Sequence, residues 1–288
     1  MKNKVAIIGF GYVGRAMHKI FPDALIYDIA FENNNGDGLL PDAPKFARMP
    51  DEINAECDLA IVCVPTPMQD DPTMEFQKVD LTIIEDVIGW LQTPLILIKS
   101  TVPPGTVERL SAKWPKKRIV FSAEYVGEGK YHISPWKYMS PTDPTLHEFQ
   151  IFGGRKEDCE AVANHFIKRL GPEKTYYIVD SIEAEIIKYA ENSWGAMKVI
   201  WAQEFYDLCQ KMGASWIRVR EGWALDNRVE KMHTAVFVDD RGFAGKCYPK
   251  DINGIVSAAD EVGVDMSLLK AVLRKNKEYQ KDKDLTIP

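Results

Sequence analysis

Residues 5–14 read VAIIGFGYVG, and this stretch decides the fold of the first half of the chain. Its first four residues form a continuous apolar run, which is typical of a buried strand in a parallel sheet. The pattern Gly-x-Gly-x-x-Gly follows at once, and an amphipathic stretch to Ile20 follows the pattern. The pattern alone is weak, but a strand, a glycine turn and a helix in this order predict a dinucleotide-binding turn.

The residues of the turn have separate expected roles. Gly9 allows a tight turn, Gly11 lets the backbone approach a pyrophosphate, and Gly14 lets the helix pack on the strand. Tyr12 and Val13 begin the helix, whose unpaired N–H groups are then expected to face the phosphates.

The second predicted strand, residues 24–27, ends at Asp28. A carboxylate at this place can bind a ribose 2′-hydroxyl and would repel a 2′-phosphate, so the predicted cofactor is NAD rather than NADP. Further apolar runs extend the pattern to an α/β fold with a Rossmann-like, doubly wound sheet. These runs are residues 59–64, 95–98, 118–121 and 150–152.

Two of these runs lead into proline-containing loops, and a third leads into an acidic segment. Ligands of open α/β sheets bind at the carboxyl ends of the strands. Cofactor contacts are therefore expected from the loop residues Val64, Pro65, Thr66, Ser100 and Thr101. Glu124 and Glu128 follow the third run, where a role in acid–base chemistry stays open beside plain surface charge.

The second half of the chain is predicted to be helical. From Ser181 to about residue 212 there is no proline, and apolar residues recur at helical spacing on more than one stripe. We expect an NAD-binding domain over residues 1–180 and an all-α central domain over residues 181–288. The long helix would be shared between domains or would join two subunits in a homodimer. Further helices are expected at 215–224, 249–262 and 266–282.

Lys188 and Asn192 lie one turn apart on the long helix and so project from one face. Such a pair is usually solvated, but the neighbouring positions here are apolar, which favours a buried functional pair.

Residues 241–251 read RGFAGKCYPKD and hold a cysteine where chemistry is plausible. Pro249 suits the first turn of a helix, so Cys247 is expected at a helix N-terminus. The positive potential of that N-terminus and of the flanking lysines, Lys246 and Lys250, favours the thiolate. Asp251 could cap the helix or move protons, and a buried packing cysteine is the alternative.

The composition argues against several classes of function. A net charge of −6 argues against a nucleic-acid partner, and no apolar run approaches the length of a membrane span. Five scattered cysteines show no metal-ligand spacing, so no metal site is expected, and they suit a cytoplasmic protein.

Together these motifs resemble the UDP-glucose/GDP-mannose dehydrogenase family. The matching segments run in order along nearly the whole chain: GFGYVG, VPTP, STVPPGT, EYVGEG, EAEIIKYAEN, LDNR and GFAGKCYPKD. The resemblance implies NAD-dependent, four-electron oxidation of a sugar primary alcohol to a carboxylate. UDP-glucose or a related nucleotide sugar would be the substrate, and a thiohemiacetal and a thioester would form on a cysteine.

The resemblance also implies roles for the residues of the helical half. Cys247 resembles the nucleophile, and Lys188 and Asn192 resemble the pair that binds substrate and stabilises oxyanions on the reacting carbon. Asp251 resembles the carboxylate that steers Lys188 and a water molecule.

Other roles follow from the same resemblance. Glu124 resembles the base for thioester hydrolysis, and Thr101 and Glu128 resemble residues of its water network. Arg228 resembles an arginine that reaches the substrate site of a neighbouring subunit, and Lys250 is expected to contact substrate as well.

Three departures from the family pattern stand out. Ala244 replaces a glycine and is expected to crowd its loop, and Gly127 replaces an arginine. The chain also ends about 40 residues after Cys247, where family members continue into a further nucleotide-binding domain. We expect this domain to be missing, so that a smaller substrate, a partner chain or a shortened sequence would have to account for its absence.

Two other functions stay open. A two-electron 3-hydroxyacid-type dehydrogenase shares a Lys-x-x-x-Asn helix but does not need Cys247. A non-catalytic NAD-binding homologue would explain a missing domain. A short-chain sugar epimerase is disfavoured, because its Tyr-x-x-x-Lys pair occurs only at Tyr279 in the charged tail.

Overall fold

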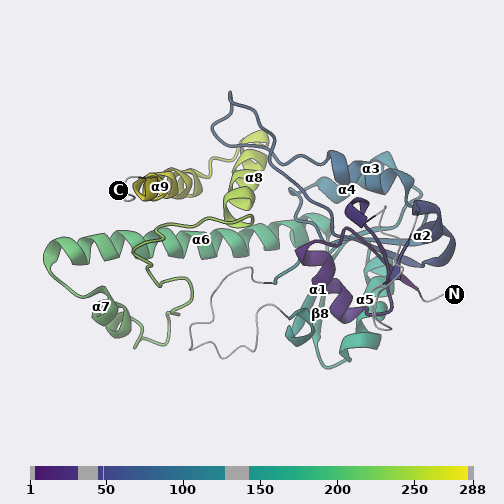
Figure 1. The fold of residues 1–288 in the computed structure, drawn as a ribbon, viewed down its shortest axis with the longest axis horizontal. Coiled ribbons are helices and arrows are strands. Elements are labelled where there is room, and N and C mark those ends of the chain that lie inside the picture. The colour runs from purple at the N-terminus through teal and green to yellow at the C-terminus, as the bar shows by residue number, and fades with distance from the viewer. Residues whose placement is uncertain (1–3, 32–44, 48, 127–142, 285–288) are drawn as a thin grey trace. The chain divides into compact units, whose positions relative to one another are not determined.

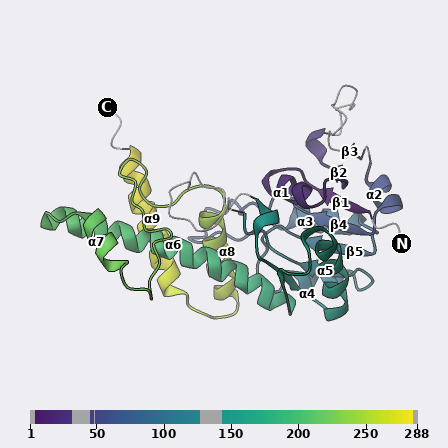
Figure 2. The same ribbon diagram turned by 90° about the horizontal axis from the view of Figure 1, so that it is seen from below.

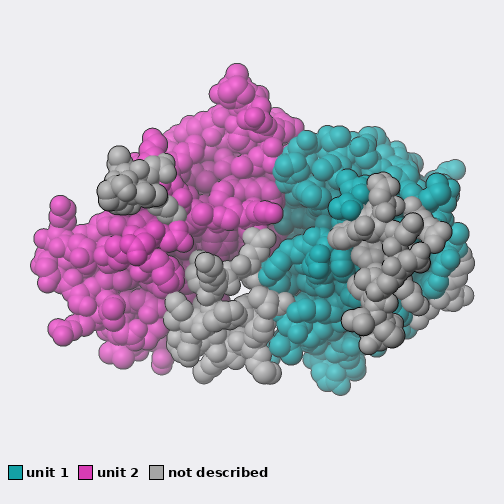
Figure 3. Space-filling model, viewed as in Figure 1, with its two compact units in different colours: residues 1–67, 80–186 teal, residues 68–79, 187–288 magenta. Residues whose placement is uncertain are grey.

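The computed structural model describes residues 4–31, 45–47, 49–126 and 143–284. The chain divides into two compact units, which are coloured separately in Figure 3. The first consists of Met1–Pro67 with Asp80–Ile186, and the second of Met68–Val79 with Ile187–Pro288. The division falls within a helix, a few residues after position 181. The inclusion of 68–79 in the helical unit is a feature that the sequence pattern did not indicate.

The described part of the first unit contains an eight-stranded sheet in the order β3-β2-β1-β4-β5-β6-β7-β8. Figure 2 labels the strands β3, β2, β1, β4 and β5 of this sheet. All neighbouring strands are parallel except β6 and β7. This order confirms the predicted doubly wound, Rossmann-like α/β fold. The strands are β1 (Val5–Ile8), β2 (Leu25–Tyr27), β3 (Lys45–Phe46), β4 (Leu59–Val62), β5 (Leu95–Ile98), β6 (Ile119–Phe121), β7 (Phe149–Gly153) and β8 (Thr175–Val179).

Helices pack on this sheet because its central strands, β1, β4, β5 and β6, are buried at every position. Helices α1 and α5 share one apolar core with these strands, in which Phe166 meets Phe21 and Phe152 edge to face. The helices of this unit are α1 (Tyr12–Ile20), α2 (Pro50–Glu56), α3 (Thr82–Trp90), α4 (Thr106–Lys113) and α5 (Lys156–Leu170), with 3-10 turns η1 (Ile29–Phe31) and η2 (Pro144–Leu146).

The second unit is helical, as predicted. Its main element is α6 (Ser181–Met212), the long helix in Figure 1, which begins in the first unit. The others are α7 (Trp216–Trp223), α8 (Tyr248–Glu261) and α9 (Ser267–Asp284). Apolar side chains of α6, α8 and α9 form one core, and Phe76 of the 68–79 segment packs against it. In the described part of the chain, every helix is too short or too polar to traverse a lipid bilayer.

Candidate functional site

The glycine turn lies at the carboxyl end of β1, against the ends of β2 and β4. Gly9 has a φ of 88°, and its N–H donates a hydrogen bond to the carbonyl of Tyr27 (2.8 Å). It has no room for a side chain, because a Cβ at this position would lie 2.8 Å from the carbonyl oxygen of Cys63. At Gly14 a Cβ would lie 2.0 Å from the carbonyl oxygen of Gly9. At Gly11 a Cβ would meet no heavy atom within 4 Å. Packing therefore explains the outer glycines, whereas the space at Gly11 fits a ligand.

Asp28 holds this turn from the end of β2. Its carboxylate accepts hydrogen bonds from the N–H groups of Phe10 (2.6 Å) and Ala30 (2.8 Å). Gly11 is the N-cap of α1 and so offers the helix no side-chain cap, and the first turn carries no acidic residue. In the described chain, no side chain caps the first N–H groups of α1. Such uncapped N–H groups are suited to bind a pyrophosphate.

The two proline-containing loops bind each other at the same edge of the sheet. The Ser100 hydroxyl donates to the Val64 carbonyl (2.7 Å), and the Thr66 hydroxyl donates to the Thr101 carbonyl (3.0 Å). Pro65, between the bonded residues, is exposed. The structure thus brings together the turn, Asp28 and both loops, and the open space at Gly11 fits the NAD that this set was predicted to bind.

Glu124 follows β6 and is paired with a buried lysine that the sequence reasoning missed. The ammonium of Lys99 lies 3.6 Å from one carboxylate oxygen of Glu124 and donates to the carbonyl of Ala123 (3.0 Å). The other oxygen of Glu124 accepts a hydrogen bond from the N–H of Tyr125 (2.8 Å). The oxygen that faces Lys99 is buried and accepts no hydrogen bond from the described residues. Glu128 and Gly127 lie outside the described residues.

Helix α4, which follows the second proline-containing loop, is capped by a residue far away in sequence. Its N-cap, Gly105, has a φ of 87° and no capping side chain. Glu185 of α6 is 0% exposed and accepts hydrogen bonds from the N–H groups of Gly105 (2.6 Å) and Val107 (2.9 Å). Burial raises the pKa of Glu185 from 4.5 to about 7, although these N–H groups oppose the shift.

This raised pKa predicts a pH-dependent stability. Between pH 4.5 and 7 the folded protein keeps a proton on Glu185 that the unfolded chain has released, so stability falls as the pH rises through this window. Over that window we expect the unfolding free energy of the wild type to fall by about 3 kcal/mol relative to Glu185→Gln. Urea denaturation of both proteins at pH 4.5, 6 and 8 measures this difference, and parallel pH curves would contradict it.

A buried polar chain joins α6 to α8 in the second unit. The Lys188 ammonium donates to the Asn192 side-chain oxygen (3.2 Å), and the Asn192 amide donates to Asp251 (2.5 Å). These three side chains are buried. Lys250 pairs with the other oxygen of Asp251, and the exposed Glu191 pairs with Lys188 (3.1 Å). Alternating charges and donors thus hold a lysine ammonium at a fixed place, where it could stabilise a developing oxyanion.

Cys247 is the N-cap residue of α8, and its carbonyl oxygen accepts a hydrogen bond from the N–H of Asp251 (2.8 Å). It is half-buried, whereas the other four cysteines are buried. Burial raises the pKa of Cys159 to about 12 and that of Cys63 further, so those thiols are unsuited to nucleophilic chemistry. Of the five thiols, Cys247 therefore has the most suitable surroundings for a nucleophile.

The loop before Cys247 does not show the crowding that was expected from Ala244. Ala244 is exposed, and the positive φ angles of its loop fall on Gly242 (76°) and Gly245 (83°) instead. The alanine therefore fits its backbone without strain. Arg228 lies in the loop after α7, with 88% of its side chain exposed and its guanidinium paired with Asp226.

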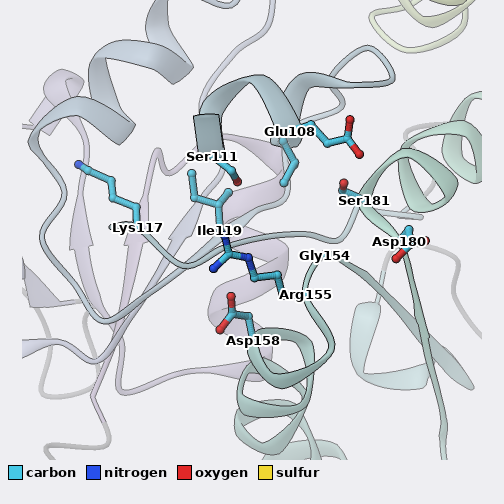
Figure 4. A pocket seen from close by; sticks show the side chains of 10 residues that line it. Glu108, Ser111, Lys117, Ile119, Gly154, Arg155, Asp158, Asp180 and Ser181 are labelled. Carbon is cyan, nitrogen blue, oxygen red and sulfur yellow. The ribbon is translucent and has the colours of Figure 1, made fainter. Parts of the chain in front are cut away.

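A cavity of about 340 Å³ in the first unit lies elsewhere (Figure 4). It is lined from α4, β6 and the starts of α5 and α6, and none of the predicted cofactor or catalytic residues lines it. Acidic and basic side chains both line it: Glu108, Asp158, Asp180, Lys117 and Arg155. In Figure 4 the Lys117 ammonium points away from the carboxylates. This balance of charge favours no class of ligand, so the cavity carries no functional assignment.

The chain resembles known proteins over most of its length. A UDP-glucose 6-dehydrogenase of Rickettsia typhi is 27% identical over 276 residues, which cover 92% of this chain and 59% of the relative. The UDP-glucose 6-dehydrogenase TuaD of Bacillus subtilis is 26% identical, with 99% of this chain and 66% of the relative covered. The solved structure of a UDP-glucose dehydrogenase from Pyrobaculum islandicum has the same fold, with a TM-score of 0.78 at 24% identity over 96% of this chain and 68% of that one.

The chain therefore spans 59% of the length of the Rickettsia typhi protein. Residues 45–132 match the NAD binding domain of the UDP-glucose/GDP-mannose dehydrogenase family, and residues 182–278 match the central domain of the same family. Both matches occur in the order that the sequence motifs predicted, and the chain belongs to the UDP-glucose/GDP-mannose dehydrogenase family.

Proposed function

We propose that this protein oxidises the primary alcohol of a nucleotide sugar to a carboxylate, using two NAD per substrate and a covalent bond to Cys247. The observation that carries the proposal is the half-buried thiol at the N-cap of α8, one turn from the buried chain of Asp251, Asn192 and Lys188. The names of the relatives make UDP-glucose the first substrate to test. The scattered cysteines support a cytoplasmic location, which cell fractionation would test.

Each residue of this set has one task in the proposed reaction. Bound NAD would supply the hydride acceptor for both oxidations. In the first, the alcohol carbon loses a hydride and its hydroxyl loses a proton to water, which gives the aldehyde. The Cys247 thiolate adds to the aldehyde carbon, and the Lys188 ammonium and the Asn192 amide stabilise the resulting oxyanion. Loss of a second hydride from that carbon leaves a thioester. Glu124 takes a proton from the water that attacks the thioester carbon, and the thiolate leaves as the carboxylate forms.

The trapped thioester tests this assignment. In Glu124→Gln the water cannot lose its proton to residue 124, so we expect the thioester to accumulate in the presence of NAD and UDP-glucose. Intact-protein mass spectrometry should show an added mass equal to the substrate less four hydrogens. The added mass should be absent when Cys247→Ala is combined with Glu124→Gln. An adduct that survives the loss of Cys247 would contradict the assignment.

We also propose a homodimer formed through α6. Large apolar side chains lie exposed along this helix, including Trp194 (53%), Phe205 (40%) and Leu208 (51%), and a second copy would cover them. The exposed Arg228 could then reach a partner's site. Light scattering should give twice the chain mass for the wild type and a monomer mass for Leu208→Glu, and a monomeric wild type would contradict the proposal.

A further inference from the structure

The loop that leads to Cys247 is held by a side chain of the last described helix. Asn276 of α9 is 7% exposed and uses both ends of its amide on one residue. Its oxygen accepts a hydrogen bond from the N–H of Phe243 (2.7 Å), and its nitrogen donates to the carbonyl oxygen of Phe243 (2.9 Å). Two antiparallel strands exchange the same pair of bonds, so Asn276 fixes the backbone of Phe243 as a neighbouring strand would.

Gln280, one turn further along α9, extends this contact. Its nitrogen donates to the carbonyl oxygens of Arg241 and Phe243, each at 3.1 Å. The Arg241 guanidinium is bound in turn to Asp207 of α6 (2.7 Å), and the Tyr279 hydroxyl donates to the other oxygen of Asp207 (2.9 Å). The loop is thus anchored on two helices of the same unit.

The loop is also shaped to receive the Asn276 amide. Gly242 has a φ of 76°, and a Cβ at this position would lie 2.5 Å from the Asn276 side-chain oxygen. After the buried Phe243, residues 244–246 are exposed, and the chain then reaches Cys247. The backbone of Phe243 is therefore the buried, hydrogen-bonded point that precedes the thiol.

We propose that Asn276 and Gln280 are positioning residues for Cys247. By fixing the backbone of residues 241–243, α9 places the thiol where it can attack the reacting carbon. The inference rests on the proposed function of Cys247 as nucleophile, and it gives α9 a role that neither the sequence motifs nor the family resemblance assigned. A misplacement of about 1 Å at a reacting group costs about 100-fold in rate.

The test compares Asn276→Ala with Lys277→Ala, a change at the exposed neighbouring position of the same helix. In Asn276→Ala we expect kcat for NADH formation to fall about 100-fold, with KM and the Kd for NAD within twofold of the wild type. Amide hydrogen exchange in residues 241–247 should become at least tenfold faster, which corresponds to a loss of about 1.4 kcal/mol in the free energy of local opening. Lys277→Ala should match the wild type in every measurement.

Asn276→Asp keeps the shape of the side chain but turns its donor into an acceptor, so it should lose as much kcat as the alanine variant. If Asn276→Ala does not fold, Gln280→Ala is the second variant. It removes only the hydrogen bonds to the carbonyls of Arg241 and Phe243, and it should lower kcat and speed amide exchange by smaller factors than Asn276→Ala.

The inference would be overturned if residues 241–247 of Asn276→Ala exchanged their amide hydrogens at the wild-type rate. It would also be overturned if exchange became faster while kcat stayed unchanged. Failure of the proposed function would show separately, as a wild type that makes no NADH from any nucleotide sugar. The exchange rates would then decide by themselves whether α9 holds the loop.

Discussion

Replacing Cys247 with alanine is expected to lower NADH formation from a nucleotide sugar by at least about 1,000-fold. Removing a catalytic nucleophile commonly costs this much or more, because the steps that follow covalent capture cannot occur. The residual turnover should stop at the aldehyde and give one NADH per substrate. The Kd for NAD should stay at the wild-type value, because the predicted cofactor residues follow β1, β2, β4 and β5 in the first unit, whereas Cys247 belongs to the second. Steady-state kinetics and calorimetric titration measure these quantities.

Cys209→Ala is the matched control for this change. Cys209 is also on the helical unit, but it is buried in a separate apolar cluster beside Trp216. Its loss should cost about 1 kcal/mol of stability and leave kcat unchanged. Full activity in Cys247→Ala would contradict the covalent mechanism and would favour a two-electron dehydrogenase.

Gly14 and Gly11 of the turn should respond in opposite ways to a single methyl group. In Gly14→Ala the new Cβ would lie 2.0 Å from the backbone oxygen of Gly9, so the turn or α1 must move. We expect a loss of about 3 kcal/mol of stability or more, with no detectable NAD binding. In Gly11→Ala the new Cβ meets no protein atom, so the fold should keep its wild-type melting temperature.

The methyl group in Gly11→Ala would instead occupy the space through which a pyrophosphate approaches the backbone. We expect NAD affinity to fall about 100-fold at unchanged stability. Thermal unfolding and calorimetric titration of both variants separate the effects. Wild-type NAD affinity in Gly11→Ala would show that the cofactor does not bind across this turn.

The fold was predictable where local patterns carry it. The glycine turn and the continuous apolar runs belong to strands that are buried at every position, so the sequence shows them directly. Strands β3 and β8 were missed for opposite reasons. Strand β3 has only two residues. Strand β8 reads TYYIV at the other edge of the sheet, and its partial burial, with Tyr177 53% exposed, separates it from the fully buried runs that were predicted as strands.

The candidate site was predictable only in part, for a related reason. Lys188 and Asn192 share a helical face that spacing alone indicates. Three contacts of the site join distant parts of the chain. They are the pairing of Lys99 with Glu124, the capping of α4 by Glu185 and the hydrogen bonds of Asn276 to Phe243. Such contacts depend on tertiary packing, and no local pattern predicts the partner. A charged residue directly after an apolar strand, as at Lys99, was the one available signal.

The stoichiometry of NADH formation tests the central claim most directly. With NAD in excess and a limited amount of UDP-glucose, followed by other nucleotide sugars, the covalent four-electron mechanism predicts two NADH for each substrate consumed, with the carboxylate as product. One NADH per substrate would contradict that mechanism.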